Sequence, residues 1–188
     1  HLLNAGPTDV TTTMHLRIHT IPPDEVEAKM APGRIQYHDL TIDPQATSSF
    51  TAPCAFAEDH ERLLQAPLQY ELHYVLFHYH VLGAYVELAL VGGDRDGEVI
   101  ARHEGYGENF GIALDPPLEL ADSGATGLAL RCGFDNPRDA EVGWGIGDQE
   151  MCVVALQARS GLAFEGDVDY DTGAMTGVGA DGEVQYAG

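Results

Sequence analysis

The stretch VLFHYHVLGAYVELAL, residues 75–90, decides the fold class of this chain. Aromatic and branched residues dominate it, as in β-strands. It carries His78 and His80 two positions apart, so both side chains lie on one face of the predicted strand. Their backbones would be roughly 6.5–7 Å apart, a spacing from which two imidazoles can converge on one metal ion. The spacing alone leaves two interpretations, a pair of metal ligands or ordinary polar strand positions.

The rest of the chain repeats this strand character. Its 188 residues include 22 glycines and 10 prolines, placed between short apolar runs. Short strands at regular spacing with turn residues between them predict an all-β fold, a jelly-roll-type antiparallel β-sandwich. We assign the sandwich to residues 35–159. Residues 160–188, rich in Gly and Asp, are predicted to form an irregular acidic tail.

Charge excludes two classes of partner. Thirty acidic residues face nine basic ones, for a formal net charge of −21, and such a surface repels nucleic acid and anionic membranes. The charge is explained by solubility or salt adaptation, or by an acidic face that binds a partner. No run of about 18 apolar residues predicts a membrane span, and no signal peptide is visible.

An alternating pattern opens the chain. Residues 11–21 place apolar side chains on one face and polar ones, including His15 and His19, on the other, which predicts a half-buried strand. Two prolines end this strand, and residues 22–34 are predicted to form a connector. The first residue is His1 rather than methionine, so we interpret the chain as processed or as a fragment of a longer protein.

A third candidate ligand lies more than 70 residues beyond the histidine pair. Met151 begins a predicted strand in GDQEMC, residues 147–152. A thioether is a poor zinc ligand but suits copper, above all Cu(I). Met151 by itself is better explained as packing, whereas the set of His78, His80 and Met151 would hold a redox-active copper.

Three motifs together resemble a known family. HYHVLG (residues 78–83), RCGFDNPRD (131–139) and GDQEMC (147–152) are similar to the C-terminal domain of the copper type II, ascorbate-dependent monooxygenases. That family includes peptidylglycine α-hydroxylating monooxygenase and dopamine β-monooxygenase, with motifs of the form His-x-His-x-x-Gly and Asp-Glu-Met-Cys. Here Gln149 is inserted in the second motif. The resemblance spans roughly residues 1–157.

The resemblance implies a copper centre and a disulfide. Copper held by His78, His80 and Met151 would activate dioxygen to hydroxylate a C–H bond, with ascorbate or another reductant as co-substrate. Cys132 and Cys152 would form a disulfide whose loop contributes roughly 3 kcal/mol of stability in a chain-entropy model; two free buried thiols are the alternative. Cys54 then has no obvious partner. One disulfide with one free thiol fits an exported, periplasmic or extracellular protein.

The first residues match the end of the family's N-terminal domain. By that match residues 1–21 would be its last strand, and His1 would bind a second, electron-transfer copper whose other ligands lie upstream. The full-length protein would then hold up to two coppers. Alternatively, a true terminal His1 could chelate copper through its amino group and imidazole, as in lytic polysaccharide monooxygenases, or it could have no role.

Departures from the family limit what the resemblance implies about substrate. Peptide-hydroxylating members have an Arg where this chain has Leu76, and polar and aromatic residues where it has Val153 and Ala155. A peptide carboxylate is therefore not expected, and the small-molecule substrate remains unassigned. His73 and His103 are either neighbours of the copper ligands or surface histidines. A non-catalytic copper-binding, structural or assembly module is the competing hypothesis, because a fold does not determine function.

Overall fold

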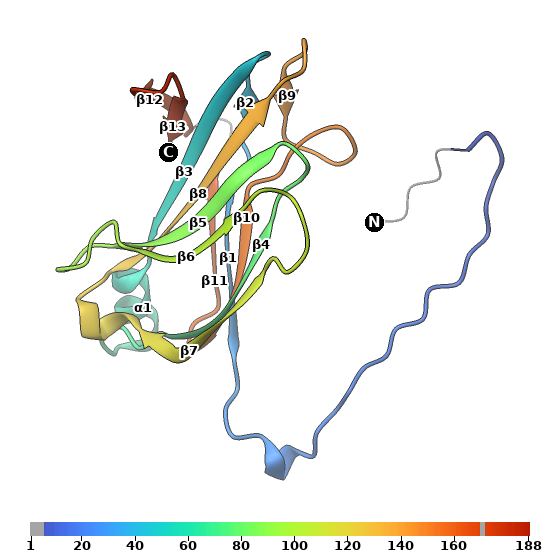
Figure 1. Cartoon of the computed structure of the whole chain (residues 1–188). Coiled ribbons are helices and arrows are strands. Elements are labelled where there is room, and N and C mark those ends of the chain that lie inside the picture. The colour runs from blue at the N-terminus through green and yellow to red at the C-terminus, as the bar shows by residue number, and fades with distance from the viewer. Residues whose placement is uncertain (1–5, 170–171) are drawn as a thin grey trace.

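Two β-sheets packed face to face form the body of the protein (Figure 1). A computed structural model describes residues 6–169 and 172–188. One sheet has five strands in the order β11-β1-β10-β4-β7, and the other has six in the order β12-β13-β3-β8-β5-β6. The β1–β11 and β13–β3 pairs are parallel, and the other strand pairs of the described residues are antiparallel. The predicted all-β sandwich is confirmed, while the finer jelly-roll topology stays a prediction.

The elements have the following bounds. The five-stranded sheet contains β1 (Ala31–Tyr37), β4 (Glu71–His78), β7 (Gly111–Glu119), β10 (Val153–Arg159) and β11 (Phe164–Val168). The six-stranded sheet contains β3 (Ala46–Ala55), β5 (Gly83–Val91), β6 (Val99–Glu104), β8 (Gly127–Asn136), β12 (Ala174–Val178) and β13 (Val184–Ala187). A small sheet pairs β2 (Thr41–Ile42) with β9 (Val142–Gly143), and the helices are η1 (Pro23–Glu25), α1 (Ala57–Leu64) and η2 (Leu120–Ser123).

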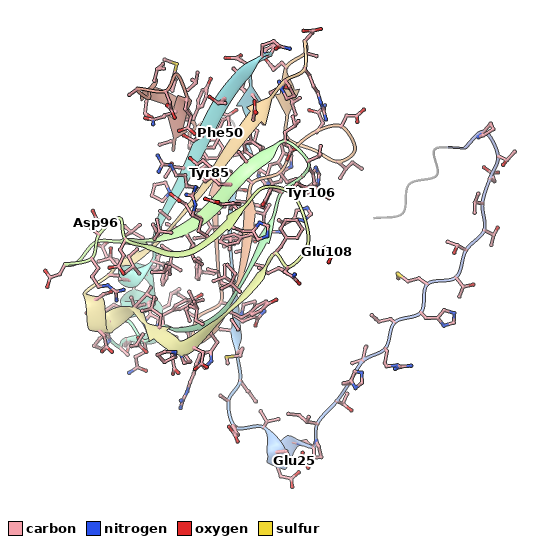
Figure 2. All side chains as sticks on the ribbon, in the orientation of Figure 1. Glu25, Phe50, Tyr85, Asp96, Tyr106 and Glu108 are labelled. Carbon is pink, nitrogen blue, oxygen red and sulfur yellow. A yellow bond between two sulfur atoms is a disulfide. The ribbon has the colours of Figure 1, made fainter. Side chains whose placement is uncertain are left out.

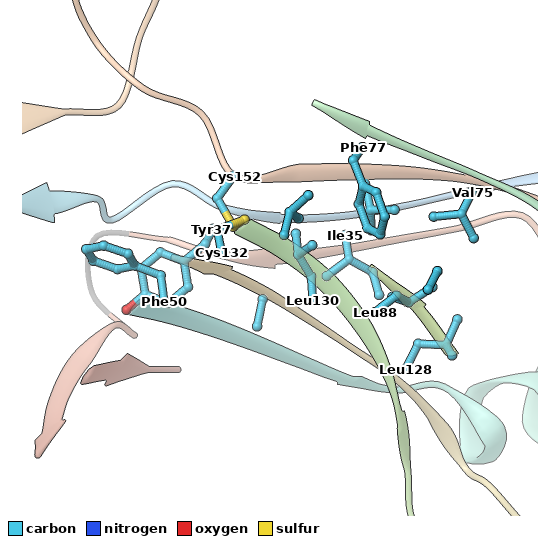
Figure 3. Close-up of a cluster of buried hydrophobic side chains, with 14 of the residues drawn as sticks. Ile35, Tyr37, Phe50, Val75, Phe77, Leu88, Leu128, Leu130, Cys132 and Cys152 are labelled. Atoms are coloured by element: carbon cyan, nitrogen blue, oxygen red, sulfur yellow. A yellow bond between two sulfur atoms is a disulfide. The ribbon is translucent and has the colours of Figure 1, made fainter. Parts of the chain in front are cut away.

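The core lies between the two sheets. Ile35, Val75 and Phe77 from the five-stranded sheet meet Leu88 and Leu130 from the six-stranded one, and each is at most 1% exposed (Figure 3). Burying a side chain of this kind contributes about 1.5–3 kcal/mol relative to leaving it in water. Since alternate residues of each strand point inward, the intervening residues form the outer face of each sheet.

A β-bulge in β4 changes which residues face outward. Against β10 the register of β4 shifts between Leu72 and Tyr74, leaving His73 as the extra residue. Against β7 the register jumps from Leu118 to Ala113 over the same step, so there the additional residues belong to β7. Leu72 is buried, whereas Tyr74 is 37% exposed, although strict alternation would put them on one face. Simple alternation continued back from the two histidines would therefore put Leu72 on the wrong face. Beyond the bulge the expected shared face of the two histidines is retained.

The N-terminal residues form no strand. Every residue from 6 to 30 is exposed, and the segment extends away from the sandwich apart from the short turn η1 (Figure 1). The strand predicted for residues 11–21 is therefore not formed here, because a strand needs a neighbour to take its backbone hydrogen bonds. Its assignment to a further domain stays a prediction. The sandwich itself begins at Ala31, inside the predicted connector 22–34.

The prediction of irregular structure for residues 160–188 is wrong. β11 pairs with β1 and β13 pairs with β3, so the segment adds strands to both sheets. Phe164 stacks on Phe56 at 4.3 Å, and Tyr186 stacks on Phe50 at 4.8 Å between ring centroids. Backbone ladders and two aromatic anchors thus order a segment whose composition lacks apolar periodicity. None of the helices in the described residues is long and apolar enough to cross a bilayer.

Candidate metal centre

The pairing of β4 with β10 sets the relation between the predicted ligands. The antiparallel ladder ends with His78 opposite Val153. Continued by two residues beyond the ladder, the same register would place Met151 opposite His80. Directly opposed residues of antiparallel strands share a face, with β-carbons about 4.5–5.5 Å apart. The structure brings His78 and His80 together at one end of the five-stranded sheet, and this register would bring Met151 to the same end.

The two imidazoles are close and differently held. Their ring centroids are 5.3 Å apart and their planes are nearly perpendicular, at 89°. The Nδ1 atom of His80 lies 2.7 Å from the Gln149 carbonyl oxygen, which can only accept, so Nδ1 carries the proton. The neutral ring then presents an unprotonated Nε2, the arrangement that backbone carbonyls impose on metal-binding histidines. Burial, and then the charge of His80, lower the pKa of His78 and favour its neutral form.

Glu150 ties the histidine loop to the methionine strand. One carboxylate oxygen accepts the backbone N–H of His80 at 2.7 Å, and the other accepts that of Leu82, also at 2.7 Å. The side chain is 1% exposed, and this burial raises the pKa of its carboxyl group, against the opposing effect of these backbone bonds. Glu150 was missed at the sequence level, because its backbone partners lie about 70 residues away.

The glycine of the His-x-His-x-x-Gly motif has a steric explanation. A β-carbon on Gly83 would lie 1.9 Å from Cδ2 of Tyr79. Tyr79 stands between the two histidines in sequence and is 2% exposed, so its ring points to the opposite side of the strand from theirs. Gly83 lets the chain turn back over this ring into β5.

The disulfide predicted from the resemblance is present. Cys132 of β8 and Cys152, just before β10, form a bridge with a Cα–Cα distance of 5.8 Å (Figure 3). It joins the two sheets and holds the backbone immediately after Met151. Cys54 is free and half-buried, and burial raises the pKa of its thiol. A disulfide fits an oxidising, exported environment.

The outer face beside the histidines is apolar. Leu76 is 43% exposed and lies opposite Ala155, while half-buried Val153 lies opposite His78. Tyr74 continues the same strip, at 37% exposed. Here Leu76 stands where peptide-hydroxylating members of the resembling family have their arginine, so this surface offers van der Waals contact rather than an ion pair.

A further histidine lies on the other side of Met151. The backbone N–H of Tyr37 donates to the Cys152 carbonyl at 3.0 Å, which extends the β1–β10 pairing by one residue; the same register would bring His38 opposite Met151. The Nδ1 atom of His38 is 2.9 Å from a carboxylate oxygen of Asp167. Sequence reasoning missed this pair, because Asp167 lies in the segment that was predicted to be irregular.

The other histidines considered in the sequence lie at different places in the structure. His73 contacts Glu71 at 3.2 Å, and His103 lies 2.6 Å from the Tyr79 hydroxyl. His15 and His19 are exposed on the N-terminal segment. The predicted ligand His1 lies outside the described residues.

The described ranges contain no group of three or more His, Cys, Asp or Glu side chains placed to hold a metal ion. A metal bound here would therefore need a ligand of another type, and the Met151 thioether is the candidate. No protein-family model matches the chain, and neither does any curated protein. The likeness to the copper type II monooxygenases thus rests on the motifs alone.

Proposed function

We propose that this protein binds copper through His78, His80 and Met151 and acts as a copper-dependent monooxygenase. The observation that supports the proposal is the β4–β10 ladder, which ends with His78 opposite Val153; the same register continued by two residues would set Met151 opposite His80. Two imidazoles and one thioether form a donor set that suits copper better than zinc, magnesium or calcium. The group would supply dioxygen activation and one-electron redox chemistry when bound.

The residues around this donor set support such a role. The Gln149 carbonyl selects the His80 tautomer with an unprotonated Nε2. Glu150 fixes the backbone of His80 through a buried hydrogen bond, so the ring keeps its position without a metal. Rigid support of this kind lowers the cost of assembling a site when a ligand binds.

The substrate class follows from the neighbouring surface. Tyr74, Leu76 and Ala155 would contact the apolar part of a small molecule and exclude water from the bond that reacts. We propose an uncharged or apolar C–H substrate rather than a peptide carboxylate. Ascorbate or another external reductant would supply electrons, and His1 with upstream residues would hold a second copper. The disulfide supports an exported, periplasmic or extracellular location.

The second candidate function is a non-catalytic copper-binding module. The open apolar face supports it equally well, because such a face also suits a partner protein. The two functions differ in turnover, since a binding module holds copper without consuming oxygen.

Copper binding is tested by titrating Cu(I) into the protein against a competing chelator and recording X-ray absorption of the loaded sample. We expect one tightly bound copper with nitrogen and sulfur neighbours. His80→Ala and Met151→Ala should each lower the affinity by at least about 10-fold, because they remove a proposed ligand. Met151→Ala should also abolish the copper–sulfur signal.

Matched controls are available for both ligand types. His73→Ala removes a histidine from the same strand, and Met175→Ala removes a methionine that is 61% exposed. Both should leave copper affinity unchanged. Equal affinity in all four variants would contradict the site. Reductant-dependent oxygen consumption by the loaded protein would support the monooxygenase, and tight copper binding without it would support the module.

A further inference from the structure

The four strands at the edges of the two large sheets differ in how their free sides are protected. A free edge presents backbone N–H and C=O groups on which another chain can pair, and proteins usually cover such an edge or place charges or prolines on it. Three of the edges carry prolines or charged side chains: Pro116 and Pro117 on β7, Arg102 and Glu104 on β6, and Glu165 and Asp167 on β11. The fourth edge, β12, has the sequence AMTGV and carries neither.

The surroundings of β12 are also uncharged. Residues 172–180, TGAMTGVGA, contain no acidic or basic side chain, although the whole chain has a formal net charge of −21. Four of the five residues of β12 are exposed, among them Met175 at 61% and Val178 at 59%. The side chains of this hairpin project outward from the body of the protein (Figure 2). The strand is thus an uncharged and uncovered edge of a strongly acidic molecule.

The neighbouring strand β13 holds β12 in place. β13 pairs with β3, and its Tyr186 stacks on Phe50. Just before β13, the Glu183 carboxylate accepts hydrogen bonds from the Ser49 hydroxyl at 2.9 Å and the Tyr85 hydroxyl at 3.3 Å. In the part of the chain that the structure describes, β12 pairs with β13 alone. The fixed strand therefore presents β12 with its other side open.

A β-bulge limits the length of this open edge. The register of β12 against β13 shifts between Met175 and Gly177, which leaves Thr176 as the extra residue. The Thr176 hydroxyl donates to the Gln185 carbonyl oxygen at 3.1 Å, so the bulge is bonded toward β13. Because a strand of five residues with a bulge can add only a short ladder, we expect any pairing at this edge to be weak and reversible.

We propose that β12 pairs antiparallel with β12 of a second copy of this chain, which joins two six-stranded sheets edge to edge. A pairing centred between Thr176 and Gly177 sets Met175 of each copy opposite Val178 of the other, so the exposed apolar side chains meet twice about a two-fold axis.

The charge of the molecule favours a second copy at this edge over a basic partner. Two chains of this net charge repel each other, and the uncharged edge is where they approach at the lowest electrostatic cost. A basic partner would instead be attracted to the acidic faces. The proposed pairing is independent of copper, because His78 lies on a strand of the other sheet.

Sedimentation velocity of the full chain over a range of protein concentrations tests the pairing. We expect a reversible dimer that becomes tighter as salt is raised, because salt screens the repulsion between the copies. Val178→Glu places like charges across the edge and should weaken the dimer at least about 10-fold. Val99→Glu is the matched control, because it puts the same charge on the edge strand β6 at a residue that is 43% exposed. It should change the dimer affinity less than about 2-fold.

Hydrogen–deuterium exchange locates the contact. The amide groups of residues 174–178 should become more protected as the protein concentration rises, whereas those of β6 should not. A monomer at every concentration and salt, a dimer unaffected by Val178→Glu, or an equal loss in Val99→Glu would overturn the proposal. Protection of residues 174–178 by a synthetic extended peptide in a chain that stays monomeric would also overturn it, because the edge would then belong to a different partner. Circular dichroism would verify that each variant is folded.

Discussion

Two buried carboxylates, one beside each sheet, are stabilised in different ways. Glu150, next to the five-stranded sheet, is 1% exposed and accepts backbone N–H groups of His80 and Leu82. Glu87, on β5 of the six-stranded sheet, is 6% exposed and pairs with the guanidinium groups of Arg102 and Arg131.

The two carboxylates differ in whether water can reach their hydrogen-bond partners once the carboxylate is removed. Arg102 and Arg131 have side chains that are 41% and 40% exposed, so water can replace Glu87. The amide groups bonded to Glu150 belong to a packed loop and would lose their only strong acceptor. Glu150 therefore stabilises the conformation of the loop that carries His80 and Leu82. Glu87 instead forms ion pairs whose arginine partners stay accessible to water.

Replacing Glu150 tests this contrast with the largest expected effect. Glu150→Ala should lower the free energy of unfolding by about 2–4 kcal/mol, because two backbone donors lose their acceptor. It should also weaken copper binding by about 10–100-fold, as loss of support for a metal ligand does. Urea denaturation and the copper titration measure the two effects. The exposed Glu141→Ala variant serves as control and should shift stability by less than about 0.5 kcal/mol.

The loop can also be tested through its glycine. Gly83→Ala should cost about 1–3 kcal/mol, because the new methyl group collides with the Tyr79 ring. In a Tyr79→Ala background the same substitution should cost much less, which a double-mutant cycle would detect as non-additivity. Gly107→Ala is the control, since nothing lies within 4 Å of its would-be β-carbon. Additive costs would show that the clash does not explain the motif glycine.

On the opposite sheet the effect should be smaller. Glu87→Ala should cost about 1 kcal/mol or less, because the freed arginines stay hydrated. The loss should shrink as salt is raised, whereas that of Glu150→Ala should persist. Thermal unfolding at two ionic strengths measures this. A salt-independent loss as large as that of Glu150→Ala would abolish the distinction between the two carboxylates.

The hydroxyl group of Tyr37 is a third buried polar group, and it has no hydrogen-bond partner among the described residues. Burial, followed by the charge of Asp39, raises the pKa of Tyr37 to about 12 from its usual value of 10. The neutral phenol is favoured in the fold, so its contribution to stability is complete below pH 10 and is lost as pH rises through 12. Tyr37→Phe should remove this part of the alkaline loss in denaturation curves and have little effect at pH 7. If the variant lost stability between pH 10 and 12 as steeply as the wild type, the raised pKa of Tyr37 would be contradicted.

Local patterns predicted the outline of the candidate site, and long-range pairing supplied the rest. The shared face of His78 and His80 follows from strand alternation, and the shift at His73 lies before them, so it did not disturb this inference. The placement of Met151 opposite His80 depends on strand register, which no local pattern encodes. The role of Glu150 was unpredictable for the same reason, because the sequence alone does not indicate which backbone N–H groups a glutamate will bind.

The strands at 164–168 and 184–187 were unpredictable for a different reason. Parallel pairing of β11 with β1 and of β13 with β3 satisfies the backbone whatever side chains it carries, so composition is a poor guide there. The converse holds for residues 11–21, whose pattern suits a strand but whose backbone has no neighbouring strand in the described chain.

The Cys132–Cys152 bridge connects the backbone beside Met151 to the opposite sheet. Cys152 is the residue after Met151, so the backbone that presents the thioether is tethered to the opposite sheet only once the two sulfurs are joined. A newly made chain with reduced thiols would hold this backbone less firmly. For the proposed copper site, we therefore expect metal binding to be tighter in the oxidised chain than in the reduced one.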